Sequence, residues 1–430
     1  METELRHKIR SAVHEHRDDA IDLLSQLVRH DSTLGNESEA QETIASRFRS
    51  MGLQVKKLAI DLEQLSVLPG FSPPASTEYG GGENVIGIHQ PRTFQGGKSL
   101  ILNGHMDVVP TGAAKLWSRP PFEPYVIDDW LYGRGSGDMK AGIVAYCMAF
   151  QALRDIGYQP AAPVILQSVV EEECTGNGAL ACLHAGYTAD AAIIPEPFAQ
   201  TLMVAQLGVM WFEVNVTGVP AHVLNTSNGN NAIEAAYALF EGLRELEKEW
   251  NSDEAKHPSF TCHDHPINFN LGRITGGDWA SSVPSSCSID VRIGFYPGMS
   301  LLSVREKIES SIQETLKKPP SCENVTYEIR YHGFQAEGCT MDRDHPMMTQ
   351  LAKLHHEVTG YECKDLASTA TTDARFFQIY GGIPATCYGP LAENIHGIDE
   401  RVSLKSMIEV AEVLALFIAD WCGLEPIAND

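Results

Sequence analysis

Hydrophobic and polar residues follow two different patterns along this chain, and each pattern predicts a different kind of structure. Residues 5–29 and 39–51 repeat apolar side chains at helical spacing, which predicts amphipathic helices. Short apolar runs between the helical segments predict buried strands, at residues 53–58, 85–89, 99–102, 164–170 and 191–194. Strands that alternate with helices predict an α/β fold, a mostly parallel sheet with helices on both faces. Residues 63–85, rich in proline and glycine, are expected to form a loop.

The pattern changes near residue 207, where polar and apolar side chains begin to alternate through residues 209–217. Such alternation is typical of an antiparallel strand with one exposed face. Further segments complete a β-α-β-β-α-β order, with helices at 231–250 and 300–317 and strands at 267–274, 287–295 and 325–332. This order predicts a two-layer α+β unit inserted into the larger domain. We therefore expect a catalytic domain in two parts, 1–206 and 335–430, and an inserted lid or dimerisation domain at 207–334.

The helical and α/β pattern returns after about residue 335. Helices are expected at 346–359, at 373–380 from Asp373, and at 407–421, with a strand at 385–388. An earlier helix is expected to begin at Asp138, directly after a glycine-rich stretch.

Composition narrows the classes of partner. The chain has 430 residues, of which 43% are hydrophobic, and a net charge of 32 − 56 = −24. So acidic a surface argues against nucleic acid or an anionic membrane as a partner. The ten cysteines form no C-x-x-C pair, the first residues are charged, and no apolar run approaches the ~20 residues of a membrane span. These features predict reduced thiols and a cytoplasmic location.

Metal-binding residue types follow several of the predicted strands. The run I-L-N-G-H-M-D delivers His105 and Asp107, and a glycine-rich stretch precedes Asp138. The other positions are Glu171–Glu173, Glu196 and the late His396. Open α/β sheets place ligands at the carboxyl ends of their strands, so these side chains are expected to converge. Taken alone, His105 and Asp107 also fit two solvated loop residues, but the whole set favours a hydrolytic site with two metal ions.

The same stretches resemble a known family in their order and chemistry. H-M-D at 105–107, G-R-G-S-G-D-M-K-A-G at 133–142, E-E-E-C-T-G-N-G at 171–178 and P-E-P at 195–197 carry the resemblance, with His396. Together they resemble the dinuclear zinc amidohydrolases that include acetylornithine deacetylase, succinyl-diaminopimelate desuccinylase, aminoacylase and carboxypeptidase G. The resemblance covers nearly the whole chain, including the inserted domain.

The resemblance implies a role for each metal ligand. His105 and Glu196 would hold one zinc ion, Glu173 and His396 the second, and Asp138 would bridge both. It implies two Zn²⁺ per subunit, with Co²⁺ as a possible substitute.

The resemblance also implies three catalytic residues. Asp107 would orient His105 through its carboxylate, and Glu172 would be the general base that takes a proton from a water held between the zinc ions. Glu171 stands where relatives commonly have aspartate, but the following C-T-G-N-G favours Glu172 as the base. His222, in G-V-P-A-H, would stabilise the oxyanion from the lid of a partner subunit, which implies a homodimer formed through the inserted domain.

Substrate recognition departs from the family pattern. Arg292 is the candidate for pairing with a substrate carboxylate, although it lies two positions earlier than in many relatives. Ser282, with Ser281, stands where several relatives have asparagine. Gly382 and Gly389 are expected to shape the pocket by close backbone approach.

Three other motifs favour structural roles. Cys262-His263-Asp264-His265 lies in a polar loop, and His355-His356 lies on a helix, where neighbours do not face one site. The glycines at 133–137 match neither a dinucleotide fingerprint nor a nucleophile elbow.

These observations predict a metal-dependent amidohydrolase that deacylates small N-acyl amino acids, with acetylornithine deacetylase-like activity as the first choice. The alternatives are a dipeptidase or carboxypeptidase, or a succinyl-diaminopimelate desuccinylase-like enzyme, with the same dizinc site. Two other classes are a dehydrogenase, which lacks its fingerprint, and a non-catalytic metal-binding descendant, which is disfavoured because Glu172 is present.

Overall fold

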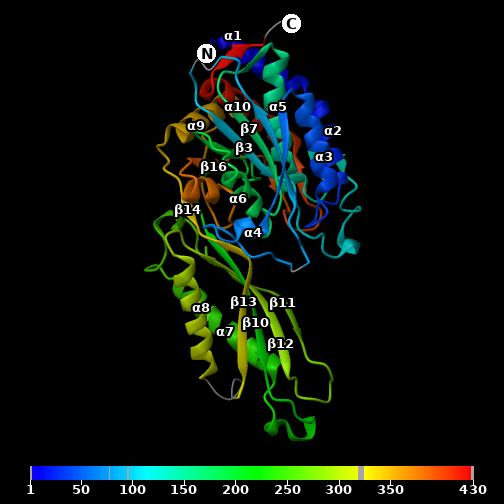
Figure 1. Cartoon of the computed structure of the whole chain (residues 1–430), viewed down its shortest axis with the longest axis vertical. Helices are drawn as coiled ribbons and strands as arrows, with labels where there is room; N and C mark the ends of the chain where they lie inside the picture. Colours follow the sequence, from blue (N-terminus) through cyan, green and yellow to red (C-terminus); the bar gives the residue numbers. More distant parts are fainter. Residues whose placement is uncertain (1, 77, 94–95, 318–323, 428–430) are drawn as a thin grey trace.

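The computed structural model describes residues 2–76, 78–93, 96–317 and 324–427. The molecule is elongated, with a large α/β part at one end and a four-stranded sheet with two helices at the other (Figure 1). Within the described residues, no helix is long and apolar enough to cross a membrane.

The large part is built on a six-stranded sheet with the order β1-β2-β7-β3-β8-β16. Its strands are β1 (Gln54–Ala59), β2 (Glu83–His89), β7 (Val164–Val169), β3 (Leu100–His105), β8 (Ala192–Ile194) and β16 (Ala385–Cys387). The strands from β7 to β16 are parallel, whereas β1 and β2 are antiparallel to their neighbours. The predicted α/β class and mostly parallel sheet are confirmed.

Helices cover both faces of this sheet, as alternate residues of β3 show. Leu100 and Leu102 pack into the core formed with α1 (Thr3–Glu15), α2 (Arg17–Arg29), α3 (Ser38–Ser50), α5 (Ala141–Asp155), α9 (Pro346–Thr359) and α10 (Leu404–Trp421). Ile101 points the other way, into a second core that includes Cys182 of α6 (Asn177–His184). Because both faces are buried, the strand is continuously apolar rather than alternating.

Two predicted segments differ in detail. The helical pattern at residues 5–29 is interrupted at His16, whose backbone (φ −85°, ψ 3°) leaves the helix and separates α1 from α2. The break lets both helices turn apolar faces to the same core. The expected loop at 63–85, apart from residue 77, contains the end of a short helix and the start of β2. The short helix is α4 (Leu62–Leu65), and the carboxylate of Asp61 caps its N-terminus.

Small sheets complete the large part, and the sequence pattern did not predict them. β9 (Leu202–Gln206) pairs with β14 (Cys339–Thr340) and β15 (Asp365–Ser368). The others are β4 (Tyr125–Ile127), β5 (Trp130–Tyr132), β17 (Ala392–Glu393) and β18 (Arg401–Ser403), and the pair β6 (Tyr158–Pro160) and β19 (Leu424–Pro426). Strands of two to five residues carry too few side chains for a periodic signal.

The second part contains the expected β-α-β-β-α-β order. Its elements are β10 (Gly208–Thr217), α7 (Ala232–Trp250), β11 (Phe269–Gly276), β12 (Ser286–Phe295), α8 (Leu301–Leu316) and β13 (Thr326–Ala336). The antiparallel sheet has the order β11-β12-β10-β13. Phe212, Val214 and Val216 pack toward α7 and α8, whereas Trp211 and its alternate neighbours lie on the opposite face. Short helical turns lie at η1 (Ala114–Leu116), η3 (Val223–Asn228) and η4 (Pro258–Phe260).

Candidate metal centre

Three adjacent parallel strands bring the candidate ligands to one edge of the sheet. His105 is the last residue of β3, Glu172 and Glu173 follow β7, and Glu196 follows β8. β7 and β8 flank β3, so their carboxyl ends meet at this edge. The strand β3 extends to His105 rather than ending near residue 102, because Asn103 is buried and its amide donates to Gln167 of β7.

Asp138 reaches the same point from a separate segment. It lies in η2 (Ser136–Lys140) and its backbone is not helical (φ −111°, ψ 97°), so the helix begins at Ala141 and not at Asp138 as predicted. Its Oδ1 is 3.2 Å from Nε2 of His105, and its Oδ2 is 3.2 Å from Nε2 of His396. One carboxylate therefore faces two imidazoles, the arrangement that a ligand bridging two metal ions requires.

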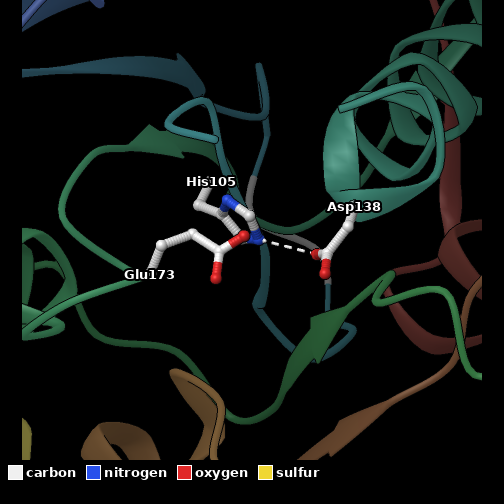
Figure 2. Close-up of side chains that lie close together, drawn as sticks. All are labelled: His105, Asp138 and Glu173. Carbon is white, nitrogen blue, oxygen red and sulfur yellow. Dashed lines mark hydrogen bonds and ion pairs between the residues drawn. The ribbon is translucent and has the colours of Figure 1, made fainter. Parts of the chain in front are cut away.

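The remaining candidate ligands lie around the same point. Nε2 of His396 is 3.0 Å from Oε2 of Glu173. Figure 2 shows the carboxylates of Glu173 and Asp138 directed at the imidazole of His105. The same Nε2 of His105 is 3.8 Å from Oε2 of Glu172 and 3.9 Å from Oε1 of Glu196.

The chemistry of this centre fits divalent metal ions. His105, Asp138 and Glu173 can hold one ion, and His105, Glu172 and Glu196 also lie close enough together to do so. Oε1 of Glu196 is buried, and no group in the described part of the chain forms a hydrogen bond with it. Burial raises the pKa of Glu172 and Glu196 well above the usual range, and neighbouring carboxylates add to this although His105 opposes it. A bound cation reverses that balance, since it favours the ionised carboxylates.

Asp107 contacts the centre differently from the prediction. Nδ1 of His105 donates to the main-chain carbonyl of Asp107 at 2.9 Å, whereas the Asp107 carboxylate is 3.7 Å from Nδ1. The carboxylate instead accepts from the amides of Glu172 at 3.2 Å and Glu173 at 3.0 Å. Two backbone amides therefore hold the Asp107 carboxylate beside the imidazole, and its expected role in orienting His105 stays a prediction.

Asp107→Asn should lower kcat or metal affinity by about 10–100-fold, the usual effect of losing a group that orients ligands. An asparagine side chain has one acceptor oxygen, so one of the two amides loses its partner and the Glu172–Glu173 backbone can shift. Metal titration and steady-state kinetics measure the effect. Asp61→Asn is the matched control, because Asp61 also accepts from two successive amides, in α4. Equal behaviour of the two variants would contradict this role.

A cleft of about 470 Å³ opens from the metal ligands to the base of the inserted unit. On that side its wall is formed by Val209, Trp211, Asn268, Arg292 and Phe334. The rings of Trp211 and Phe334 pack edge to face, with their centroids 5.2 Å apart. Trp211 is directly opposite Arg292 in the β10–β12 ladder. The cleft therefore offers an aromatic surface and a guanidinium side by side.

The structure separates the three remaining predicted residues. Arg292 lines the cleft, where its guanidinium lies 3.4 Å from the carbonyl of Thr369. The backbones of His222 and Ser282 pair in an isolated β-bridge beyond the far end of β10, and neither residue lines the cleft. Ser282 therefore lies outside the cleft that Arg292 lines within one chain, and the roles of Ser282 and of His222 in a partner subunit stay predictions.

The other singled-out residues lie in ordinary structural contacts. His263 forms a hydrogen bond with the carbonyl of Ala367, and His355 forms one with the hydroxyl of Tyr388. A Cβ on Gly389 would lie 2.2 Å from the carbonyl of Glu196, so close approach explains this glycine. Gly382 is explained differently: open space surrounds it, and its φ of +61° lies in the left-handed region that favours glycine.

Sequence reasoning missed Arg134 and Glu400, which are buried behind the ligands and paired at 2.5 Å. It also expected a helix from Asp373, whereas the helical turn η5 spans Phe376–Tyr380 and Asp373 is buried beside the centre. No spacing rule marks such residues, because their partners are hundreds of positions away in the sequence.

Comparisons with known proteins identify the family of the chain. A model described as "Peptidase family M20/M25/M40" matches residues 101–420. Two proteins named N-formyl-4-amino-5-aminomethyl-2-methylpyrimidine deformylase are similar. The one from Halalkalibacterium halodurans is 30% identical over a stretch that covers 79% of this chain and 83% of the relative. The one from Bacillus subtilis is 27% identical, covering 97% and 98%.

Other relatives carry different names. A succinyl-diaminopimelate desuccinylase from Stenotrophomonas maltophilia is 26% identical, covering 90% of this chain and 95% of its own. The solved structure of the dipeptidase Dug1p from Saccharomyces cerevisiae superposes with a TM-score of 0.78 at 13% identity, covering 97% and 98% of the two chains. At that identity the likeness shows the fold alone.

Proposed function

The chain belongs to peptidase family M20/M25/M40 and is a hydrolase of amide bonds, and we propose that it removes a short acyl group from the nitrogen of a small amine. The observation that carries the proposal is Asp138, whose two oxygens face His105 and His396 at 3.2 Å each. This supports two metal ions, one held by His105 and Glu196 and the other by Glu173 and His396, with Asp138 between them. Zinc suits these nitrogen and oxygen ligands, and cobalt is a possible substitute.

We propose Glu172 as the general base and acid. When bound, the ions would polarise the amide carbonyl and acidify the attacking water. Glu172 is buried at the edge of the centre, 3.8 Å from Nε2 of His105. Its carboxylate would take the proton from the water and pass it to the departing amine nitrogen.

We propose formyl as the acyl group and an aminopyrimidine as the amine. The two deformylase relatives support this, one of them over nearly the full length of both chains. The cleft supports it independently, because Trp211 and Phe334 present an aromatic corner against which a planar ring can stack. Among the described residues that line the cleft, the acidic ones are confined to the metal ligands and Glu172.

Deacylation of an N-acyl amino acid, as in acetylornithine deacetylase or the desuccinylase, is the second candidate. Arg292 favours it, because a guanidinium in the cleft pairs well with a substrate carboxylate. The lack of a further acidic residue among the described residues that line the cleft disfavours ornithine itself, because its side-chain ammonium would need a carboxylate partner.

The test is to compare product release from three substrates by the zinc-loaded protein. They are N-formyl-4-amino-5-aminomethyl-2-methylpyrimidine, N2-acetylornithine and N-succinyl-diaminopimelate. We expect the highest kcat/KM for the formylpyrimidine. A preference for either amino acid derivative would replace the first candidate with the second, and no cleavage of any would contradict the proposed substrate class.

Two variants separate the candidates further. Trp211→Leu should raise KM for the formylpyrimidine by about 3–10-fold, since a ring contact contributes about 0.5–1.5 kcal/mol. Arg292→Met should raise KM for a carboxylate substrate about tenfold or more, since a hydrogen bond to a charged group contributes about 1.5–3 kcal/mol. Each variant is the control for the other, because Trp211 and Arg292 are opposite each other in one ladder. The same change with both substrates would contradict separate roles.

A homodimer formed through the inserted unit, residues 207–334, is part of the same proposal. His222 lies too far along the unit to line the cleft of its own chain. A partner chain would have to bring His222 to the oxyanion.

A further inference from the structure

A buried ion pair lies behind the metal centre. Arg134 is 1% exposed and Glu400 is 0% exposed, and Nη1 of Arg134 is 2.5 Å from Oε2 of Glu400. Arg134 precedes the ligand Asp138 by four residues, and Glu400 follows the ligand His396 by four. The pair therefore joins the two chain segments that deliver these ligands.

The Glu400 carboxylate fixes the segment that carries Asp138. Its Oε1 accepts from the amides of Gly137 at 3.0 Å and Asp138 at 3.1 Å. The carbonyl of Glu400 also accepts from the amide of Gly133 at 2.9 Å. Because the Asp138 backbone is not helical, no helical bond holds its amide, and Glu400 takes that place.

The Arg134 guanidinium fixes the segment that carries His396. Its Nη2 donates to the carbonyl of Gly397 at 3.0 Å, directly after the ligand. This segment is conformationally unfavourable by itself, since Asn394, His396 and Asp399 all have positive φ. Contacts from outside the segment must therefore hold His396 toward Asp138.

Stability alone does not explain this pair. Burying two charges carries a desolvation cost that often equals their attraction, and apolar replacements of similar volume are often as stable. Apolar residues in place of the pair could not form the hydrogen bonds to the Asp138 amide and the Gly397 carbonyl.

We propose that Arg134 and Glu400 are positioning residues that hold Asp138 and His396 together and so create the second metal position. The inference rests on the proposed two-metal function. The pair affects the two ions differently. The position of Glu173 and His396 depends on the pair through two ligands, Asp138 and His396. The position of His105 and Glu196, at the ends of β3 and β8, depends on it through Asp138 alone.

The test uses the double variant Arg134→Met/Glu400→Met, which leaves no buried charge without a partner. We expect a folded protein in which the ion held by Glu173 and His396 binds about 10–100-fold more weakly, while the ion held by His105 and Glu196 is weakened less. Elemental analysis after dialysis at limiting zinc should then give about one ion per chain instead of about two. Calorimetric zinc titration gives the two affinities, and circular dichroism confirms folding. Arg134→Lys, which keeps the charge opposite Glu400 but has one nitrogen for two acceptors, should give an intermediate loss.

Glu412→Gln is the matched control. Glu412 is 2% exposed and paired with Arg10, but it lies on α10 against α1. We expect this variant to bind two ions with wild-type affinity. Wild-type affinities in the double variant, or equal weakening of both ions, would overturn the inference. A single ion in the wild type would instead overturn the two-metal function itself.

Discussion

Glu172→Gln should lower kcat by about 10²–10⁴-fold, the range expected for losing a general base, while both metal ions stay bound. Glutamine has nearly the same shape as glutamate but cannot accept the proton from water at neutral pH. Steady-state kinetics on the best of the three substrates measures the loss, and elemental analysis confirms that the metal content is unchanged.

Glu171→Gln is the control for this prediction. Glu171 is the neighbouring carboxylate and is also buried, but its Oε2 accepts from Thr175 at 2.6 Å and from Asn177 at 3.3 Å. It belongs to neither group that can hold a metal ion. We expect Glu171→Gln to lower kcat far less than Glu172→Gln. Equal losses, or activity retained in Glu172→Gln, would contradict the assignment of the base.

Removal of the metal ions should abolish amide hydrolysis and lower the melting temperature. Without a cation, the buried carboxylate of Glu196 and the half-buried carboxylates of Asp138 and Glu173 lie close together beside the imidazoles of His105 and His396. Free zinc at about 100 times its Kd should contribute about 2.7 kcal/mol to folding stability. Dialysis against a chelator, followed by added zinc, should remove and then restore both properties.

The Glu172→Gln variant separates the two effects of the metal. It should melt at a lower temperature after chelation, as the wild type does, although it has little activity to lose. Hydrolysis that persists in protein shown to be free of metal would contradict the proposed mechanism. An unchanged melting temperature would contradict the view that the ions neutralise the buried carboxylates.

The sequence predicted those elements in which local pattern and burial agree. The apolar run before His105 and the alternation through residues 209–217 gave a buried parallel strand and a half-exposed antiparallel one. The order of the second unit, β-α-β-β-α-β, was likewise predicted and is confirmed. These features depend on which face of each element is buried, and a residue carries that information in its own side chain.

Candidate ligands could also be named from sequence, because His105, Glu173 and Glu196 follow strands and residues after parallel strands gather at one edge. Asp107 shows the limit of this reasoning. Its place beside His105 was correct, yet the partners of its carboxylate are the amides of Glu172 and Glu173, some 65 residues later.

The tertiary structure alone decided the rest. It placed β3 between β7 and β8, kept Asp138 out of the helix, and separated Ser282 from Arg292. It also joined Arg134 to Glu400, 266 positions apart. The physical reason is that burial periodicity is a local property, whereas the choice of a hydrogen-bond partner depends on which distant segments the whole packed chain brings together.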